Sequence, residues 1–388
     1  MRPVFIVYKL SLMNCRLRFL AISLFLISCT SQKSITLTNK SQLKLLGEYD
    51  IPFNQVFNNT TIGGLSGIDY DPKHQFYYLI CDDRSAINPS RFYSAKIYFT
   101  TKGIDSVKFV SVYKLLQPGG TVYPNSKQDP YHTPDPEAIR YNPKTNQLVW
   151  SSEGERIIRN DISVLEDPSV RIVSREGNYI DSFVLPPNVH MQAVEKGPRQ
   201  NGVFEGMSFS NDYKTLFVNV EEPLYEDGPR AGLHDSSGWI RLIKFDVKTR
   251  KPQAEYAYKI DPVAYPANPI GAFKINGVPD ILAVNNHQLL VIERSFSTGR
   301  LPCTIKVYLA ELNGASDVLN TISLKNGTFR PAEKRLLLNM DDLGIFVDNI
   351  EGVTLGPKLS NGHSTLVFVS DNNFSKEQVT QLLLFEVQ

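Results

Sequence analysis

Acidic residues recur at matching places along this sequence, and their spacing is its most informative chemical feature. Glu137, Glu205 and Glu351 each stand directly before a small residue and open a run in which apolar and polar residues alternate. A second acid follows each run, and in three copies it lies 15 positions after the small residue, since 82−67, 153−138 and 221−206 all give 15. Carboxylates that lie close together raise one another's pKa, and a bound cation relieves that repulsion. The pattern indicates a metal site or a set of catalytic acids and bases.

A hard cation is the metal that such a set suits. Ca²⁺ takes about six to eight oxygen ligands at about 2.3–2.6 Å. The candidate metal ligands are Glu137, Glu205, Glu351, Asp280, Asp82 and Glu221, and the candidate catalytic residues are Glu205, Glu137, Glu351 and Arg294. The alternative is that each glutamate accepts hydrogen bonds from backbone N–H groups of a neighbouring repeat and so acts as a structural latch.

Arginines accompany the acids at the ends of these runs. Arg84, Arg156 and Arg294 each follow an acidic residue directly. Because arginine pairs with phosphate in a bidentate manner, a mixed surface of acids and arginines suits a phosphate-bearing substrate. Arg84, Arg156 and Asp371 are therefore candidate ligand-binding residues. The alternative is that they form surface ion pairs, each worth about 0–1 kcal/mol.

Other hydrolase motifs are absent from the sequence. It contains no G-x-S-x-G and no H-E-x-x-H, and its 6 histidines are scattered without the spacing of zinc ligands. A serine-esterase mechanism is therefore poorly supported. Attack by water with the help of a metal ion fits the available groups better.

The acids belong to a repeat that predicts the fold. Alternating runs with a polar turn between them are typical of hairpins of half-buried strands. The aligned positions are 67, 138, 206, 281 and 352, with intervals of 71, 68, 75 and 71, and Ser66 and Asp280 replace the glutamate in the first and fourth copies. With about four strands per repeat, this predicts an all-β propeller of five blades, or of six if an irregular insert hides a degenerate repeat. The last repeat has one outer strand, 381–387, and residues 43–51 are expected to complete its blade and close the ring without a free edge.

The start of the chain has the features of an export signal. An apolar run at 19–28 follows Arg16 and Arg18, and it is too short for a stable membrane-spanning helix. Leu-Ile-Ser-Cys at 26–29 resembles the lipobox of bacterial lipoproteins, so residues 1–28 are expected to be a signal peptide, Cys29 the lipidation site and 29–42 a polar tether before a domain at 43–388. The expected location is the cell envelope, with the membrane contacted through the lipid at Cys29. The alternative is an ordinary secretory signal with a chance cysteine, and either Met1 or Met13 is the start.

Composition narrows the classes of partner. The formal net charge is +1 and no basic run stands out, which argues against nucleic acid. Besides Cys29, only Cys81 and Cys303 remain after processing, so no disulfide framework is expected. Cys81 ends an apolar run and is expected to be buried; a bridge to Cys303 is the alternative.

Five passages together resemble one known family. They read GGLSGIDYDP, DPEAIRYNP, FEGMSFSNDY, DILAVNNHQLLVIER and NIEGVTLGP. In this order they resemble the phytase-like domain, the "esterase-like activity of phytase" family, over roughly residues 45–388. The resemblance implies a β-propeller with hydrolase activity on an ester or phosphoester of a small molecule, and it carries over no catalytic set. Two hypotheses follow: a lipid-anchored, calcium-assisted hydrolase, or a non-catalytic surface propeller that binds a ligand or a partner protein.

Overall fold

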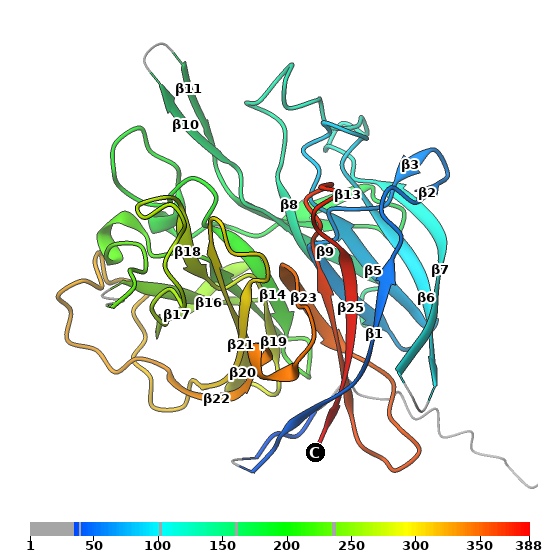
Figure 1. Cartoon of the computed structure of the whole chain (residues 1–388). Coiled ribbons are helices and arrows are strands. Elements are labelled where there is room, and N and C mark those ends of the chain that lie inside the picture. Colours follow the sequence, from blue (N-terminus) through cyan, green and yellow to red (C-terminus); the bar gives the residue numbers. More distant parts are fainter. Residues whose placement is uncertain (1–34, 39, 101–102, 160–161, 235–237) are drawn as a thin grey trace, which may run out of the picture. The chain divides into compact units, whose positions relative to one another are not determined.

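The alternating runs of the sequence form antiparallel strands, and five sheets of at least four strands make a β-propeller, which confirms the predicted fold class (Figure 1). The structure is a computed structural model that describes residues 35–38, 40–100, 103–159, 162–234 and 238–388. Within these ranges the five-blade count holds, and no sixth blade is present.

Each blade is one meander or one variant of it, with its innermost strand first. The first blade contains β4 (Gly67–Asp71), β5 (Phe76–Cys81), β6 (Arg91–Thr100) and β7 (Gly103–Lys114). The second contains β8 (Pro136–Asn142), β9 (Gln147–Ser152), β12 (Ser169–Val173) and β13 (Tyr179–Ser182). The third contains β14 (Phe204–Phe209), β15 (Thr215–Val220), β16 (Trp239–Asp246) and β17 (Lys251–Lys259).

The fourth blade has a divided inner strand. Its two parts, β18 (Lys274–Gly277) and β19 (Ile281–Ala283), both pair with β20 (Gln288–Ser297). The blade continues through β21 (Thr304–Glu311) and β22 (Glu333–Asn339). The fifth blade contains β23 (Ile350–Leu355), β24 (Thr365–Ser370), β25 (Thr380–Val387) and β1 (Leu43–Ile51).

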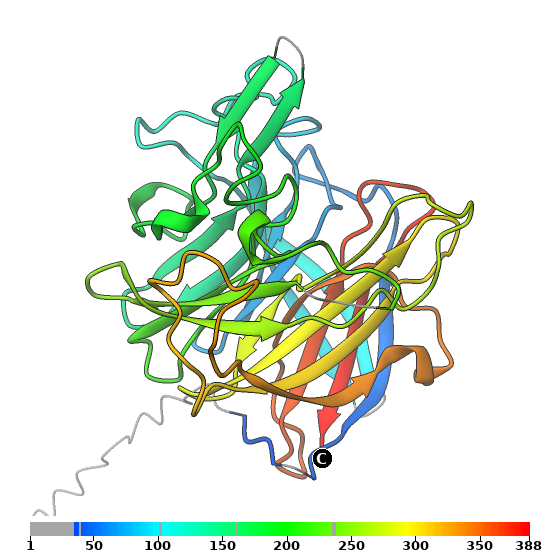
Figure 2. The ribbon, with the colours of Figure 1, turned by 90° about the vertical axis from the view of Figure 1, so that its left-hand side faces the viewer.

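Short elements decorate the connections between blades. Two small hairpins are β2 (Val56–Phe57) with β3 (Thr60–Thr61), and β10 (Glu155–Arg159) with β11 (Ile162–Glu166). The second of these projects away from the blades in both views (Figures 1 and 2). Three 3₁₀ turns are described: η1 (Pro187–Val189), η2 (Tyr225–Asp227) and η3 (Met340–Leu343). In the described part of the chain, no helix is long and apolar enough to span a membrane.

The ring closes through the two ends of the domain, as predicted. β1 runs antiparallel to β25 from the Leu43–Val387 pair to the Ile51–Thr380 pair, and the two strands lie side by side in Figure 1. The last strand of the chain therefore has a partner on each side, β24 and β1. This pairing covers the backbone donors and acceptors that β25 would otherwise expose.

Small residues occupy the repeated positions because the inner strands crowd at the centre of the ring. A Cβ atom on Gly67 would lie 2.7 Å from the carbonyl oxygen of Glu137 in the next blade. A Cβ atom on Gly206 would lie 2.5 Å from the Cα of Asp280. Both distances are far below van der Waals contact, so a larger residue would push adjacent blades apart.

The core lies between the blades rather than inside any one of them. The second strands β5, β9, β15 and β24 are buried at every position after the first, on both faces. The prediction of half-buried strands was wrong for these four, because each blade packs a neighbour on both of its faces. A stack of rigid, doubly buried strands fixes the loops at their ends, where the acids lie.

Candidate functional site

Backbone bulges position the repeated glutamates. The register between β8 and β9 shifts between Pro136 and Ile139, and that between β14 and β15 shifts between Phe204 and Met207. A third shift, between Ile350 and Gly352, lies on β23. Each shift places one extra residue on the inner strand at the acidic position. A bulge re-aims a side chain that regular pleating would send to one face, and bulges are common beside active sites.

The three glutamates at these bulges line one cavity. Its volume is about 200 Å³. Six carboxyl side chains and a single guanidinium contribute to its lining, together with polar and apolar residues; the charged members are Asp82, Glu137, Glu153, Glu205, Glu221, Glu351 and Arg294. The structure thus brings together six of the sequence-predicted residues: the three glutamates of the repeat, Asp82, Glu221 and Arg294. So many acids around one cation would leave a large excess of negative charge if all of them were ionised.

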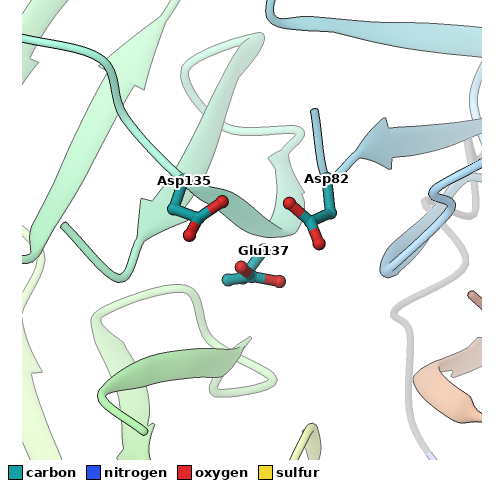
Figure 3. Close-up of side chains that lie close together, drawn as sticks. All are labelled: Asp82, Asp135 and Glu137. Atoms are coloured by element: carbon teal, nitrogen blue, oxygen red, sulfur yellow. The ribbon is translucent and has the colours of Figure 1, made fainter. Parts of the chain in front are cut away.

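The closest carboxyl groups form two triads that share one member. Oxygen atoms of Asp82, Asp135 and Glu137 lie within 4.8 Å of one another, and Figure 3 shows these three carboxyl groups facing a common point. Oxygen atoms of Glu137, Glu153 and Glu205 meet the same limit. Glu137 therefore lies between two potential cation positions.

Burial and mutual repulsion hold these carboxyl groups far from their ordinary titration range. Burial first, and then the neighbouring Glu205, raises the pKa of Glu137 well above its usual value. The pKa of Glu205 is raised well above its usual value by burial and by Glu153. Burial and Glu221 raise the pKa of Glu153 to about 8. Carboxyl groups with strongly raised pKa values concentrate at functional sites. Burying such groups costs stability, so their presence points to a role in function.

Arg294 is the cation that faces this acidic cavity. Its Nη2 donates to Glu221 at 2.7 Å, and its Nη1 donates to Asn349 at 2.6 Å and lies 3.2 Å from Glu351. Its Nε, although buried, has no hydrogen-bond partner within the described residues. The guanidinium thus keeps donor capacity beyond the contacts that hold it in place.

The latch interpretation applies to the backbone of the glutamates and not to their carboxyl groups. Ser66 donates from Oγ to the carbonyl oxygen of Glu137 at 2.7 Å, and Ser151 donates in the same way to Glu205 at 2.9 Å. Across the described ranges, no backbone N–H donates to the carboxyl of Glu137, Glu205 or Glu351. The backbones of Glu137 and Glu205 are therefore held by neighbouring blades, while the side chains of all three glutamates line the cavity.

Asp280 does not belong to the cavity. Its carboxyl binds Nη2 of Arg140 at 2.7 and 2.6 Å and accepts hydrogen bonds from the backbone of Ile281 and Val353. The sequence places it in register with the glutamates, and the inner strand again carries one extra residue here, since Gly277 pairs with Arg294 and Ile281 with Val291. What differs is that the buried Arg140 of another blade binds this carboxyl. Asp280 therefore acts as a latch between blades, in contrast to its predicted grouping with the metal ligands.

The predicted ligand-binding residues lie around the cavity rather than in its lining. Arg84 binds Glu155 and lies 3.8 Å from Asp135, so it neutralises the outer side of one triad. Arg156 donates to the carbonyl of Gln192 at 2.9 Å and holds a loop. Asp371 is buried. Burial of Glu351 raises the pKa of that carboxyl to about 8, and the charge of Asp371 adds to the rise.

Two contributors were missed by reasoning from the sequence. Asp135 completes the first triad, and Asn349 holds Glu351 through a 2.8 Å hydrogen bond from Nδ2. A signal for both exists, because each lies two residues before a repeated glutamate, where residues of an extended chain share a side.

The cysteines agree with the absence of a disulfide framework. Cys81 and Cys303 are both free and buried, so the alternative of a bridge between them was wrong. Cys81 donates from Sγ to the carbonyl of Gly63 at 3.0 Å. The proposed lipidation residue, Cys29, lies outside the described residues.

Comparisons with known proteins place the chain in a family. No curated protein sequence matches it. Solved structures with a similar fold include an endo-arabinase from Bacteroides thetaiotaomicron, at 12% identity and a TM-score of 0.42 over 83% of this chain and 93% of that one. A gluconolactonase from Xanthomonas campestris follows at 9% identity and a TM-score of 0.38 over 93% and 96% of the two chains. The model of one family, "Phytase-like: Esterase-like activity of phytase", matches residues 60–374, which include most of the five blades and the whole acidic cavity. The chain belongs to this phytase-like family.

Proposed function

We propose that this protein is a metal-dependent hydrolase of a small ester or phosphoester, with its active site in the acidic cavity. The observation that carries the proposal is the pair of carboxyl triads that share Glu137. Membership of the phytase-like family supports hydrolysis as the type of reaction. The lipobox-like sequence before Cys29 supports an envelope-anchored protein.

The residues of the triads fit a calcium ion. Oxygen atoms bound to one Ca²⁺ at about 2.3–2.6 Å lie at most about 5 Å apart, and the triad oxygens lie within 4.8 Å of one another. Asp82, Asp135 and Glu137 would hold one ion, and Glu137, Glu153 and Glu205 a second. No histidine or cysteine is among the residues that line the cavity, which disfavours zinc.

Charge balance makes the cation necessary for an anionic substrate. Six carboxyl groups and one guanidinium line the cavity, so a phosphoester would meet net repulsion if the carboxylates were ionised and alone. Bound Ca²⁺ would supply the positive charge that draws in the ester and polarises its oxygen. The same charge would remove the mutual repulsion that raises the pKa values of the triads.

The remaining residues of the cavity have roles in the hydrolysis that their contacts define. Water adds to the carbon or phosphorus atom, the ester C–O or P–O bond breaks, and the alcohol leaves with the electron pair and a proton. Arg294, held by Glu221 and Asn349, would place its positive charge beside the negative charge that develops on the ester oxygens. Glu351 lines the cavity outside both triads, where Arg294 and Asn349 hold it, so it would donate a proton to the leaving alcohol and regain one from the attacking water.

Metal content and turnover test the proposal together. Purified protein should bind calcium by titration calorimetry and hydrolyse 4-nitrophenyl phosphate or 4-nitrophenyl acetate, and chelator should abolish both. Glu137→Gln removes the shared ligand at nearly constant volume, so calcium affinity and turnover should fall together.

A matched control separates chemistry from stability. Glu293 is a buried carboxyl whose partners, Tyr258 and Lys334, lie outside the cavity lining. Glu293→Gln should change stability without changing calcium affinity. Protein that binds no divalent cation and turns over neither ester would instead support a non-catalytic propeller whose acids are structural.

A further inference from the structure

A second cavity adjoins the acidic one and shares its wall. Its volume is about 330 Å³, and four residues line both cavities: Arg294, Phe296, Asn349 and Asn373. We call this second cavity the side pocket. A ligand in the side pocket therefore lies against the same guanidinium that faces the carboxyl triads. Its size is at the lower end of the range of small-molecule sites, which is about 300–1,000 Å³.

The side pocket is more apolar than the acidic cavity. Phe296, Leu301, Pro302 and Phe346 line it. Leu301 is 67% exposed and Phe346 is 44% exposed, so two large apolar side chains border this one pocket and remain in contact with water. An apolar ligand that covered them would gain the free energy of removing that surface from water.

The charged residues of the side pocket are already engaged or balanced. Arg300 stacks on the ring of Tyr265, 4.0 Å from its centroid, and donates to the carbonyl of Pro302. Asp348 accepts hydrogen bonds from the backbone of Asn349 and Val379. Two arginines and two acids line the pocket, so it offers no excess of positive charge to a polyanion.

We infer that the side pocket binds the organic group of the ester, and that this group is apolar or aromatic and of roughly the size of a benzene or naphthalene ring. The inference rests on the proposed function for the position of the ester bond, which would lie at Arg294, between the two cavities. The substrate class is then a monoester of an apolar or aryl alcohol, and a polyol that carries several phosphate groups does not fit.

Binding of two non-hydrolysable phosphonates tests this assignment directly. Phenylphosphonate and methylphosphonate share the anionic head and differ in the group that would enter the side pocket. With calcium present, the phenyl compound should bind about ten- to a hundredfold more tightly, as expected for burial of one aromatic ring. Phe346→Asp and Leu301→Asp should each remove most of that ratio while affinity for methylphosphonate stays within about twofold, since neither residue lines the acidic cavity.

Further variants guard against an indirect effect on folding. Ile322 is 81% exposed and does not line the side pocket, so Ile322→Asp makes the same type of change elsewhere and should keep the full ratio. Phe346→Ala, a milder change, should lose an intermediate part of it. Equal affinities of wild type for the two phosphonates would overturn the inference, as would tighter binding of inositol hexakisphosphate than of phenylphosphonate.

A neutral probe separates failure of the side pocket from failure of the proposed function. 2-Naphthol carries no charge, so its binding, followed by fluorescence, should be the same for wild type and Glu137→Gln and unaffected by chelator. It should be lost in Phe346→Asp. If 2-naphthol binds in this way and no ester is turned over, the proposed function is wrong and the side pocket stands. If esters are turned over but Phe346→Asp alters neither 2-naphthol binding nor the KM for 4-nitrophenyl esters, the side pocket assignment is wrong.

Discussion

Arg140 on the second blade binds both carboxyl oxygens of Asp280 on the fourth blade, at 2.7 and 2.6 Å. These two blades are not neighbours, so the pair crosses the centre of the ring. Arg140 also donates to the carbonyls of Ile68 and Met207, and Asp280 accepts from the backbone of Val353. The five residues come from the five different blades, so a single buried ion pair ties the whole ring together.

Breaking this pair should destabilise the propeller without touching the cavity. Arg140→Met leaves Asp280 as a buried, uncompensated charge, and removal of one partner of a buried pair costs about 3–5 kcal/mol. Urea unfolding should show this loss equally with calcium and with chelator. Arg250→Met breaks an exposed pair with Asp181, at 3.0 Å, and serves as the control, with an expected change of about 1 kcal/mol or less. A similarly small change for Arg140→Met would contradict the role given to the pair.

Removal of the N-terminal strand should open the ring. β1 covers the edge of β25 along almost its whole length, from Leu43 to Ile51. Deletion of residues 43–51 exposes that edge and the apolar side chains behind it, so aggregation or loss of cooperative unfolding is expected. Size-exclusion chromatography and a melting curve measure the outcome. A monomeric truncated protein with an unchanged Tm would show that closure by the two termini contributes nothing.

The architecture was predictable because it repeats. Five aligned copies of one hairpin, and a last blade that lacked a strand, led to the five-blade ring and to the pairing of 43–51 with 381–387. The local alternation of apolar and polar residues predicted the strands correctly, but it predicted that only one face of each would be buried. A short stretch of sequence shows which residues are apolar, and it does not show which neighbouring blades cover them. The stacking of blades on both faces arises only in the folded protein, and it explains why strands such as Phe76–Cys81 are buried on both faces.

The alignment of the repeats predicts which residues hold equivalent positions at the site, but it does not predict which partners their side chains bind. Glu137, Glu205 and Glu351 gather as the repeat implies, because each lies at an equivalent bulge. Asp280 holds the same place in the alignment, and the inner strand also has one extra residue there, between the Gly277–Arg294 and Ile281–Val291 pairs, yet its carboxyl binds Arg140. A charged partner from a non-neighbouring blade decides this case, and no periodic pattern in the sequence records such a partner.

The lipid anchor can be tested independently of the fold. Cys29 follows Leu-Ile-Ser at the end of an apolar run, which is the motif that motivates the prediction. Cys29→Ser should move the protein from the membrane fraction to the soluble fraction of its native host, because the acyl chains would have no attachment point. Cys303→Ser, a change at a buried free thiol, is the control and should fractionate like wild type. Identical soluble fractions for wild type and Cys29→Ser would rule out the anchor.

The raised pKa values of the cavity fix the sign of a pH effect on stability. The pKa values of Glu153 and Glu351 are both about 8 in the folded protein, against 4.5 as the ordinary value. Between these pH values the folded state holds protons that the unfolded state has released. Stability from these groups is therefore fully present below about pH 4.5 and is lost as the pH rises toward about 8.

Calcium should cancel that loss, and the comparison separates a metal site from a merely acidic one. In chelator, the Tm is expected to fall between pH 5 and pH 8; with calcium the ion replaces the protons and adds about 2.7 kcal/mol at a hundredfold excess over its Kd. Glu205→Gln removes one buried charge and one ligand, so its Tm should depend less on pH in chelator and gain less from calcium. Thermal unfolding of both proteins at the two pH values provides the measurement. A wild-type Tm that rises with pH in chelator would contradict the raised pKa values, and a wild-type Tm that calcium leaves unchanged at pH 8 would exclude the calcium site.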